Sequence, residues 1–198
     1  MMDEPARIHR TAEVAPEARI GNGTRVWNQA QVRERARIGA DCVIGKNVYV
    51  DAEVVIGDRV KVQNNVSIFR GVTIEDGAFI GPHVCFTNDR QPRSVNPDGS
   101  RLGEADWQVS PTLVRAGASL GANSTVLCGL TIGRWAMVGA GSVVTGDIAD
   151  HELAVGNPAR RIGGVCPCGQ PLPDGVDGAP FRGNCPACGA AFPPEEAG

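Results

Sequence analysis

Four of the seven cysteines in this 198-residue chain lie close together near its end, in the motifs CPCG and CPACG. Thiolate sulfurs are strong ligands for Zn²⁺, and two cysteine pairs with a short spacer are typical of tetrahedral four-thiolate sites. The first pair is C-x-C, one residue shorter than the usual C-x-x-C. We predict a structural zinc site, with two disulfides as the alternative. Its ligands are Cys166, Cys168, Cys185 and Cys188.

A second set of polar residues could support acid-base or binding chemistry. His83 is of the residue type best suited to a general base at neutral pH. Asn65, eighteen residues earlier, offers an amide donor and acceptor. Arg70 and Arg93 carry guanidinium groups, which suit phosphates and carboxylates. The alternative for all four is structural, because polar residues at repeat corners bond to one another and exposed arginines are common.

These residues are set in a strict six-residue repeat. Every sixth residue from Ile8 to Phe86 is apolar and mostly β-branched, and the same phase resumes from Val114 to Val144. A second small or branched residue lies two positions before most of them, which gives each short strand two inward positions. Such a period is the signature of a parallel β-helix. Three strands per coil would stack residues eighteen apart at about 4.7–4.9 Å.

Stacking at eighteen predicts a polar column that contains Gln29, Asn47, Asn65 and His83, joined by Asn123 if Val114 lies on the third face. Glycines directly follow many inward aliphatics, where we expect φ > 0 or a close backbone approach. These glycines are Gly21, Gly39, Gly45, Gly57, Gly81, Gly121, Gly133 and Gly139.

The segment 87–113 interrupts the repeat with a stretch rich in proline and glycine. Loops longer than about 12–15 residues in a compact domain are usually functional. Trp107 within it would anchor the loop or pack on a flat ligand. The chain is therefore divided into a β-helix domain at 1–164, with an inserted loop at 87–113, and a zinc-binding tail at 165–198.

Composition excludes several classes of function. A net charge of -3 without a basic stripe argues against nucleic-acid binding. No apolar run reaches the length of a membrane span, and the first residues lack an apolar signal core. We expect a cytoplasmic protein with no membrane partner.

The hexads together with QNN (63–65), FTN (86–88), PR (92–93) and GNPARRIG after the last coil resemble the hexapeptide-repeat acyltransferases. The nearest pattern is that of nucleotide-sugar N-acetyltransferases acting on UDP-2-acetamido-3-amino-2,3-dideoxyglucuronate. The segments WNQAQV and DGSRLGEADW depart from that branch, and related enzymes accept dTDP-linked 3-amino sugars instead. The resemblance implies an all-β, left-handed parallel β-helix, a homotrimer, and acetyl-CoA as cosubstrate.

The resemblance also implies roles for particular residues. The asparagine of FTN, Asn88, would lie beside the sugar amine. The pantetheine arm would follow the glycine-rich last coils, with basic residues near the nucleotide phosphates. The implied cofactor-binding residues are Gly117, Gly121, Gly139, Asn157, Pro158, Arg160 and Arg161.

The predicted reaction is direct attack of the sugar amine on the thioester. An amine with a pKa near ~8 is partly neutral at pH 7, so a strong base is not required. Asn88 would orient the amine, and backbone amides near Gly117 or Gly121 would face the oxyanion. Two alternatives remain: a sugar O-acetyltransferase with His83 as base, as in O-acetyltransferases of this fold, or a non-catalytic β-helix scaffold.

Overall fold

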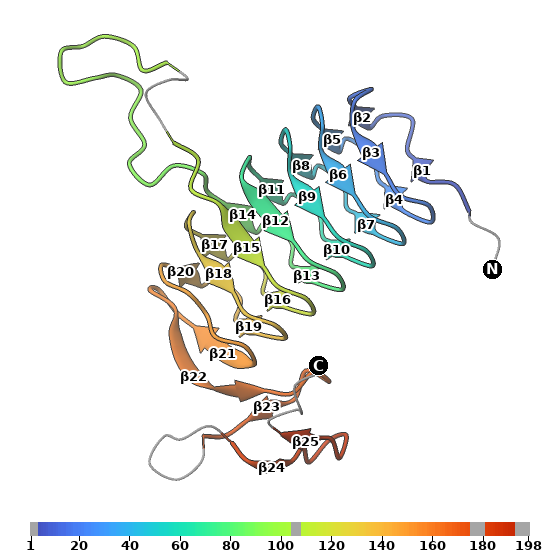
Figure 1. Ribbon diagram of the computed structural model, residues 1–198, viewed down its shortest axis with the longest axis vertical. Coiled ribbons are helices and arrows are strands. Elements are labelled where there is room, and N and C mark those ends of the chain that lie inside the picture. Colours follow the sequence, from blue (N-terminus) through green and yellow to red (C-terminus); the bar gives the residue numbers. More distant parts are fainter. Residues whose placement is uncertain (1–3, 104–107, 175–180, 193–198) are drawn as a thin grey trace.

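The computed structural model describes residues 4–103, 108–174 and 181–192, so Trp107 lies outside the described residues. All regular elements in these ranges are β-strands, most of them two residues long. They wind into a three-sided prism whose faces we call A, B and C (Figure 1). A small two-stranded sheet lies beyond the prism, with β24 at Gly183–Asn184 and β25 at Ala191–Phe192.

Face A is a ten-stranded sheet. Its strands are β1 (Arg7–Ile8), β4 (Arg25–Val26), β7 (Val43–Ile44), β10 (Lys61–Val62), β13 (Phe79–Ile80), β16 (Ser119–Leu120), β19 (Met137–Val138), β21 (Glu152–Val155), β22 (Arg160–Val165) and β23 (Pro171–Leu172).

Faces B and C have seven and six strands. Face B contains β2 (Glu13–Val14), β5 (Gln31–Val32), β8 (Tyr49–Val50), β11 (Ser67–Ile68), β14 (Cys85–Phe86), β17 (Thr125–Val126) and β20 (Val143–Val144). Face C contains β3 (Arg19–Ile20), β6 (Arg37–Ile38), β9 (Val55–Ile56), β12 (Val72–Ile74), β15 (Thr112–Val114) and β18 (Thr131–Ile132).

The strand register confirms the predicted eighteen-residue coil. Val26 pairs with Ile44, and Ile44 pairs with Val62, in parallel. Ile74 pairs with Val114 across the insertion, so Val114 resumes on the third face. The sixth-residue aliphatics from Val26 to Phe86 are almost fully buried and form one continuous core.

The glycines that follow the inward aliphatics are required by the close packing of successive coils and not by a positive φ. A Cβ on Gly21 would lie 2.5 Å from the carbonyl carbon of Gly39 in the next coil. The positive φ occurs two residues later in each turn, at 62° for both Asn65 and His83. The close approach that we expected is therefore present, and the expectation of positive φ at these glycines is wrong. In each turn it is the third residue that adopts the αL conformation, which Asn and His tolerate.

The inserted loop leaves the prism after β14 and reaches far out from it (Figure 1). Its described part closes on itself, because the N–H of Asn96 donates to the carbonyl of Ser100 at 2.8 Å and Val95 bridges Arg101. At its base, Nε of Arg90 donates to the carbonyl of Cys128 at 3.2 Å. The loop is thus a folded projection.

The C-terminal tail continues from face A. β22 runs antiparallel to both β21 and β23, and the boundary predicted at 164/165 falls inside it. The tail has its own small core of Cys166, Leu172, Cys185 and Phe192. Phe192 meets the ring of His151 edge-on at 5.3 Å. Among the described residues, no helix has the length and apolar character needed to cross a bilayer.

Candidate active site

The predicted polar column is present on edge AB, which we define as the turns that lead from face A to face B, such as 63–65 and 81–83. Nδ2 of Asn47 donates to Oδ1 of Asn65 at 3.0 Å, and Nδ2 of Asn65 lies 3.3 Å from Nε2 of His83. An amide NH₂ can only donate, so Nε2 of His83 accepts this bond. Neutral His83 therefore carries its proton on Nδ1, and the Nε2 lone pair is occupied.

Small residues line the same edge in the coils after His83. The turns there are Gly121-Ala122-Asn123 and Gly139-Ala140-Gly141. The N–H of Gly121 donates to the carbonyl of Val138 at 2.7 Å, and that of Gly139 donates to Ala154 at 2.8 Å. These predicted cofactor residues are therefore committed to the coil stack, since a Cβ on Gly121 would lie 2.4 Å from the nitrogen of Ala140 and one on Gly139 would lie 2.6 Å from Cγ1 of Val155.

Gly117 lies elsewhere, on edge CA between faces C and A. Its N–H donates to the carbonyl of Asp76 at 3.0 Å, and a Cβ on it would lie 2.4 Å from the ring of Trp135. The structure thus separates Gly117 from Gly121 and Gly139. The N–H groups of Gly117 and Gly121 are both used within the coil stack, so a predicted oxyanion donor near either glycine would have to be a neighbouring amide.

Sequence reasoning missed Ala122 and Ala140, the middle residues of the two turns. Within the described chain, the N–H of each has no hydrogen-bond acceptor. At the equivalent place three coils before Ala122, the N–H of Lys46 donates to Oδ1 of Asn64 in the next coil at 2.9 Å. Ala140 has no such oxygen to offer Ala122. The signal in the sequence is alanine in two successive middle positions.

Gly81 keeps the N–H of Ala122 uncovered from the other side. A Cβ on Gly81 would lie only 2.7 Å from this nitrogen. The absence of a side chain on Gly81 therefore leaves room for the half-buried backbone of Ala122 on the next coil. Edge AB therefore presents a backbone donor at Ala122 without an acceptor in the described chain, as it also does at Asn64 and Ala140.

The segment Gly156 to Arg161 closes edge AB. The N–H of Gly156 donates to Oγ of Ser142 at 3.0 Å, which stacks the segment on the last coil. Asn157 and Pro158 are exposed there and joined by a cis peptide. Arg160 donates from Nη1 to the carbonyl of Ala159 at 2.9 Å, and Arg161 pairs with Asp174 of the tail.

Arg70 lies on a different edge, BC, between faces B and C. Its guanidinium pairs with Glu53 at 2.7 Å, and Glu53 also pairs with Arg35 at 2.8 Å. The hydrogen bond from Arg35, with the charges of Arg70 and Arg35, holds the pKa of Glu53 below its usual range. We predicted that Arg70 binds substrate. Its positive charge is instead already neutralised by the carboxylate of Glu53.

The structure brings Asn88 and Arg93 together at the start of the loop. Both line a cavity of about 410 Å³, whose wall also contains Asp89, Ser94, Arg101, Leu102 and Gly103. Asn88 follows β14 and His83 precedes it, so these two predicted catalytic residues lie at opposite ends of one strand. Within a single chain they are on different edges of the prism.

The four cysteines of the tail form a compact cluster. Their Sγ atoms all lie within 4.8 Å of one another, with 3.7 Å between Cys166 and Cys188 and 3.8 Å between Cys168 and Cys185. A tetrahedron with Zn–S bonds of about 2.3 Å has sulfurs about 3.8 Å apart, whereas a disulfide needs about 2.05 Å. The distances fit zinc and exclude disulfides in this state. Burial opposes ionisation of Cys185, yet hydrogen bonds from the backbone of Cys188 and Ala187 lower its pKa to about 7.

The triangular coils and the glycine-lined edge define a class, the proteins built on hexapeptide repeats. Residues 35–70 match the family model described as bacterial transferase hexapeptide (six repeats), and residues 116–146 match hexapeptide repeat of succinyl-transferase. These two segments match hexapeptide repeats, and the chain has the fold of a left-handed parallel β-helix. The fold and the resemblance stated from the sequence are confirmed.

Curated relatives of this chain are acetyltransferases. The dTDP-3-amino-3,6-dideoxy-α-D-galactopyranose 3-N-acetyltransferase of Aneurinibacillus thermoaerophilus is 61% identical over 61 residues, which are 31% of this chain and 32% of that enzyme. Serine acetyltransferase 4 of Arabidopsis thaliana is 36% identical over 95 residues, 48% of this chain and 24% of that enzyme. The matched regions thus span a third or less of these relatives.

Solved structures share the fold. A mutant GDP-perosamine N-acetyltransferase from Caulobacter crescentus, in complex with CoA and GDP-perosamine, aligns with a TM-score of 0.55 at 24% identity over 81% of this chain and 58% of its own. A UDP-N-acetylglucosamine acyltransferase from Bacteroides fragilis aligns with a TM-score of 0.66 at 17% identity over 81% of this chain and 62% of its own. At these identities the likeness establishes the architecture alone.

Proposed function

We propose that this protein is an acetyl-CoA-dependent N-acetyltransferase that acetylates the 3-amino group of a nucleotide-linked amino sugar, either a UDP-3-amino-uronate or a dTDP-3-amino sugar. The observation that carries the proposal is edge AB, where the N–H of Ala122, without an acceptor in the described chain, lies one coil beyond His83 of the polar column. The 61% identity to a dTDP-3-amino-sugar 3-N-acetyltransferase supports the substrate class.

In the proposed reaction, the neutral amine attacks the thioester carbonyl. The C–N bond forms, the carbonyl oxygen becomes an oxyanion, and collapse breaks the C–S bond to release the CoA thiolate. The ammonium proton passes to solvent or to that thiolate. The N–H of Ala122 would stabilise the oxyanion, since donors fixed beforehand act where charge develops. Asn88 would orient the amine through its side-chain oxygen.

Acetyl-CoA would lie along edge AB. Gly121 and Gly139 let successive coils stack closely there, and the N–H of Ala140, which has no acceptor in the described chain, could donate to a pantetheine carbonyl. Arg160, exposed beside Asn157 and Pro158, would meet the phosphates. Arg161 could bind the phosphates as well only if its ion pair with Asp174 were broken.

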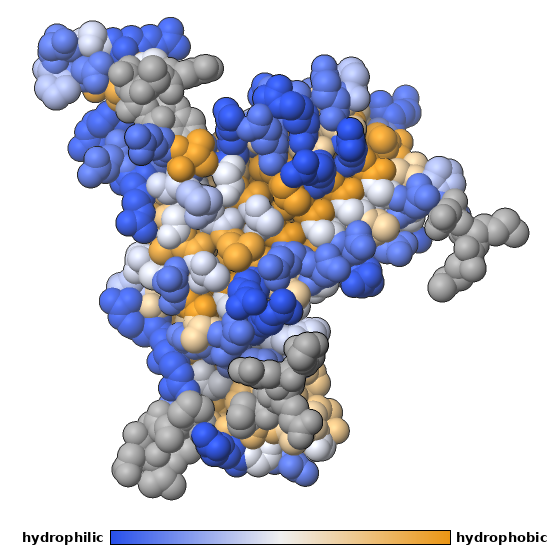
Figure 2. All heavy atoms as spheres, viewed as in Figure 1, coloured by the Kyte–Doolittle hydropathy of each residue, from blue (hydrophilic) through white to orange (hydrophobic). Residues whose placement is uncertain are grey.

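A homotrimer would complete the site, because His83 and Asn88 lie at opposite ends of β14 in one chain. The loop carrying Asn88 projects away from its own prism (Figure 1), and its Val95 is 49% exposed. Figure 2 shows an apolar band along the prism face that carries β9, β12 and β15. We propose that the loop of one chain reaches edge AB of the next. A protein that is monomeric by native mass spectrometry and yet fully active in acetyl transfer would contradict this.

His83 decides between the proposal and the sugar O-acetyltransferase. A hydroxyl needs a general base, whereas Nε2 of His83 already accepts a hydrogen bond from Asn65. We expect His83→Ala to keep most of the acetyl-transfer rate, measured with an amino-sugar acceptor. A loss beyond about 10²-fold, the lower bound for general-base catalysis, would favour O-acetylation.

For the tail we propose a structural zinc ion held by Cys166, Cys168, Cys185 and Cys188, which the sulfur spacing supports. A closed four-thiolate site leaves no open position for substrate, so the metal would stabilise the tail and take no part in acyl transfer.

Mass spectrometry of acetyl transfer tests the activity directly. The full chain is incubated with acetyl-CoA and a panel of UDP- and dTDP-linked 3-amino sugars, with matching hydroxyl sugars as controls. We expect acetylation of one amino sugar and none of the hydroxyl controls. No transfer and no binding of acetyl-CoA would leave the non-catalytic scaffold as the better account.

A further inference from the structure

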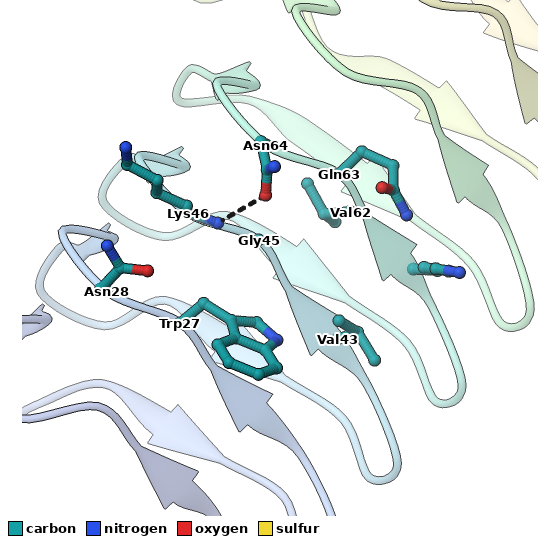
Figure 3. A pocket seen from close by; sticks show the side chains of 9 residues that line it. Trp27, Asn28, Val43, Gly45, Lys46, Val62, Gln63 and Asn64 are labelled. Carbon is teal, nitrogen blue, oxygen red and sulfur yellow. Dashed lines mark hydrogen bonds between the residues drawn. The ribbon is translucent and has the colours of Figure 1, made fainter.

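A surface groove on edge AB, separate from the residues of the acyl transfer, begins three coils before His83. It has a volume of about 340 Å³ (Figure 3). We call it the Trp27 groove. It is lined by Trp27, Asn28, Val43, Gly45, Lys46, Lys61, Val62, Gln63 and Asn64.

Trp27 offers this groove a flat apolar surface. Its side chain is 50% exposed, although a large indole normally packs away from water. No ring-ring contact involves Trp27 within the described residues. In Figure 3 the indole extends toward Val43 on the neighbouring coil, and Gly45 adds no side chain to cover it. An exposed, unpaired indole is suited to stacking on an aromatic ligand.

The charge of the groove favours an anion. Lys46 and Lys61 both line it, no carboxylate does, and neither lysine forms an ion pair in the described chain. This positive patch lies in a chain whose net charge is -3. Two ammonium groups on flexible stems suit a diphosphate.

The side-chain amides of the groove can form hydrogen bonds with polar atoms of a ligand. Asn64 uses its Oδ1 to accept from the N–H of Lys46 at 2.9 Å, so its NH₂ group remains to donate (Figure 3). Gln63 adds a second amide from the same turn, and Asn28 adds a third from two coils earlier. A ligand with an aromatic ring, carbonyl oxygens and a diphosphate would satisfy each of these features.

Building on the proposed function, we propose that the Trp27 groove binds the nucleoside diphosphate half of the sugar nucleotide. Trp27 stacks on the base, and Lys46 and Lys61 bind the diphosphate. Trp27 and Asn64 lie two coils apart, about 10 Å at the usual strand spacing, which suits a nucleoside diphosphate. Asn65 follows Asn64 directly and bonds to His83, so the attached sugar would extend along edge AB toward Ala122.

Calorimetric titration of the full chain with UDP and dTDP, without acetyl-CoA, tests the subsite. We expect Trp27→Ala to weaken binding of the preferred nucleotide roughly tenfold or more, as for loss of one base stack. Lys46→Ala with Lys61→Ala should weaken it and flatten its salt dependence. Trp135→Ala is the matched control, because Trp135 is 42% exposed on edge CA, and it should bind like the unaltered chain.

The outcomes separate the subsite from the activity. Absence of binding of both nucleotides to the unaltered chain, unchanged binding by Trp27→Ala, or an equal loss in Trp135→Ala would each overturn the subsite. Nucleotide binding that depends on Trp27 supports it even if the sugar panel shows no acetyl transfer, which would count against the proposed function alone. Acetyl transfer that is insensitive to Trp27→Ala in kcat/KM would count against the subsite alone.

Discussion

Replacing Ala122 with proline is expected to lower kcat for acetyl transfer about 10²- to 10³-fold, the usual cost of losing one oxyanion donor. Proline removes the N–H, and the turn can accept it, because Pro82 occupies the same middle position one coil earlier. Both turns continue to a residue with positive φ, 62° at His83 and 59° at Asn123. This is the Pro-then-αL arrangement of a type II turn.

Steady-state kinetics with saturating acetyl-CoA measures this effect. Ala122→Ser is the control, because it keeps the N–H and adds only a hydroxyl to a half-buried site. The thermal midpoints of both variants should stay near that of the unaltered protein, which shows that the coil stack is intact. A well-folded Ala122→Pro protein with nearly full kcat would show that the oxyanion is stabilised elsewhere.

Removal of the zinc is expected to unfold the tail while the prism stays folded. The metal-binding free energy of four-thiolate sites is of the order of 10–16 kcal/mol and is coupled to folding. The tail core of Cys166, Leu172, Cys185 and Phe192 is small and separate from the core of the prism. Cys188→Ser should therefore bind less than stoichiometric zinc and lose amide protection across 166–174 and 181–192.

Elemental analysis and hydrogen exchange on protein purified without chelator measure both effects. Cys85→Ser is the matched control, since Cys85 is a half-buried thiol on β14 far from the cluster in sequence. It should retain one zinc per chain and a protected tail. Absence of zinc from the unaltered protein would end the proposal.

Most of the fold could be predicted from the six-residue repeat. A six-residue period fixes which residues point inward, and the eighteen-residue coil follows, so the pairing of Val26 with Ile44 could be read in advance. The same arithmetic placed Asn65 under His83. The cluster of four cysteines could also be predicted, because its members lie within one short segment of the sequence.

The remaining features depend on backbone details that composition does not reveal. The sequence left open whether a glycine after an inward aliphatic serves a positive φ or a close approach, and at Gly21 it is the 2.5 Å approach of the next coil. The free N–H of Ala122 depends on the turn of the next coil, where Ala140 has no side-chain oxygen to accept from it. The pairing of Arg70 with Glu53 depends on which corner each residue occupies. These are properties of the stacked turns and not of any one turn.

Because the coils stack regularly, equivalent positions along edge AB are separated by a whole number of coils. Each step along it is one strand spacing of about 4.8 Å, from Trp27 through Asn65 and His83 to Ala122. Since each coil contacts only its neighbours, eighteen residues could be added or removed in phase without rebuilding the rest. A longer or shorter ligand arm could thus be matched one step at a time, while the pair His83 and Ala122 keeps its relative position.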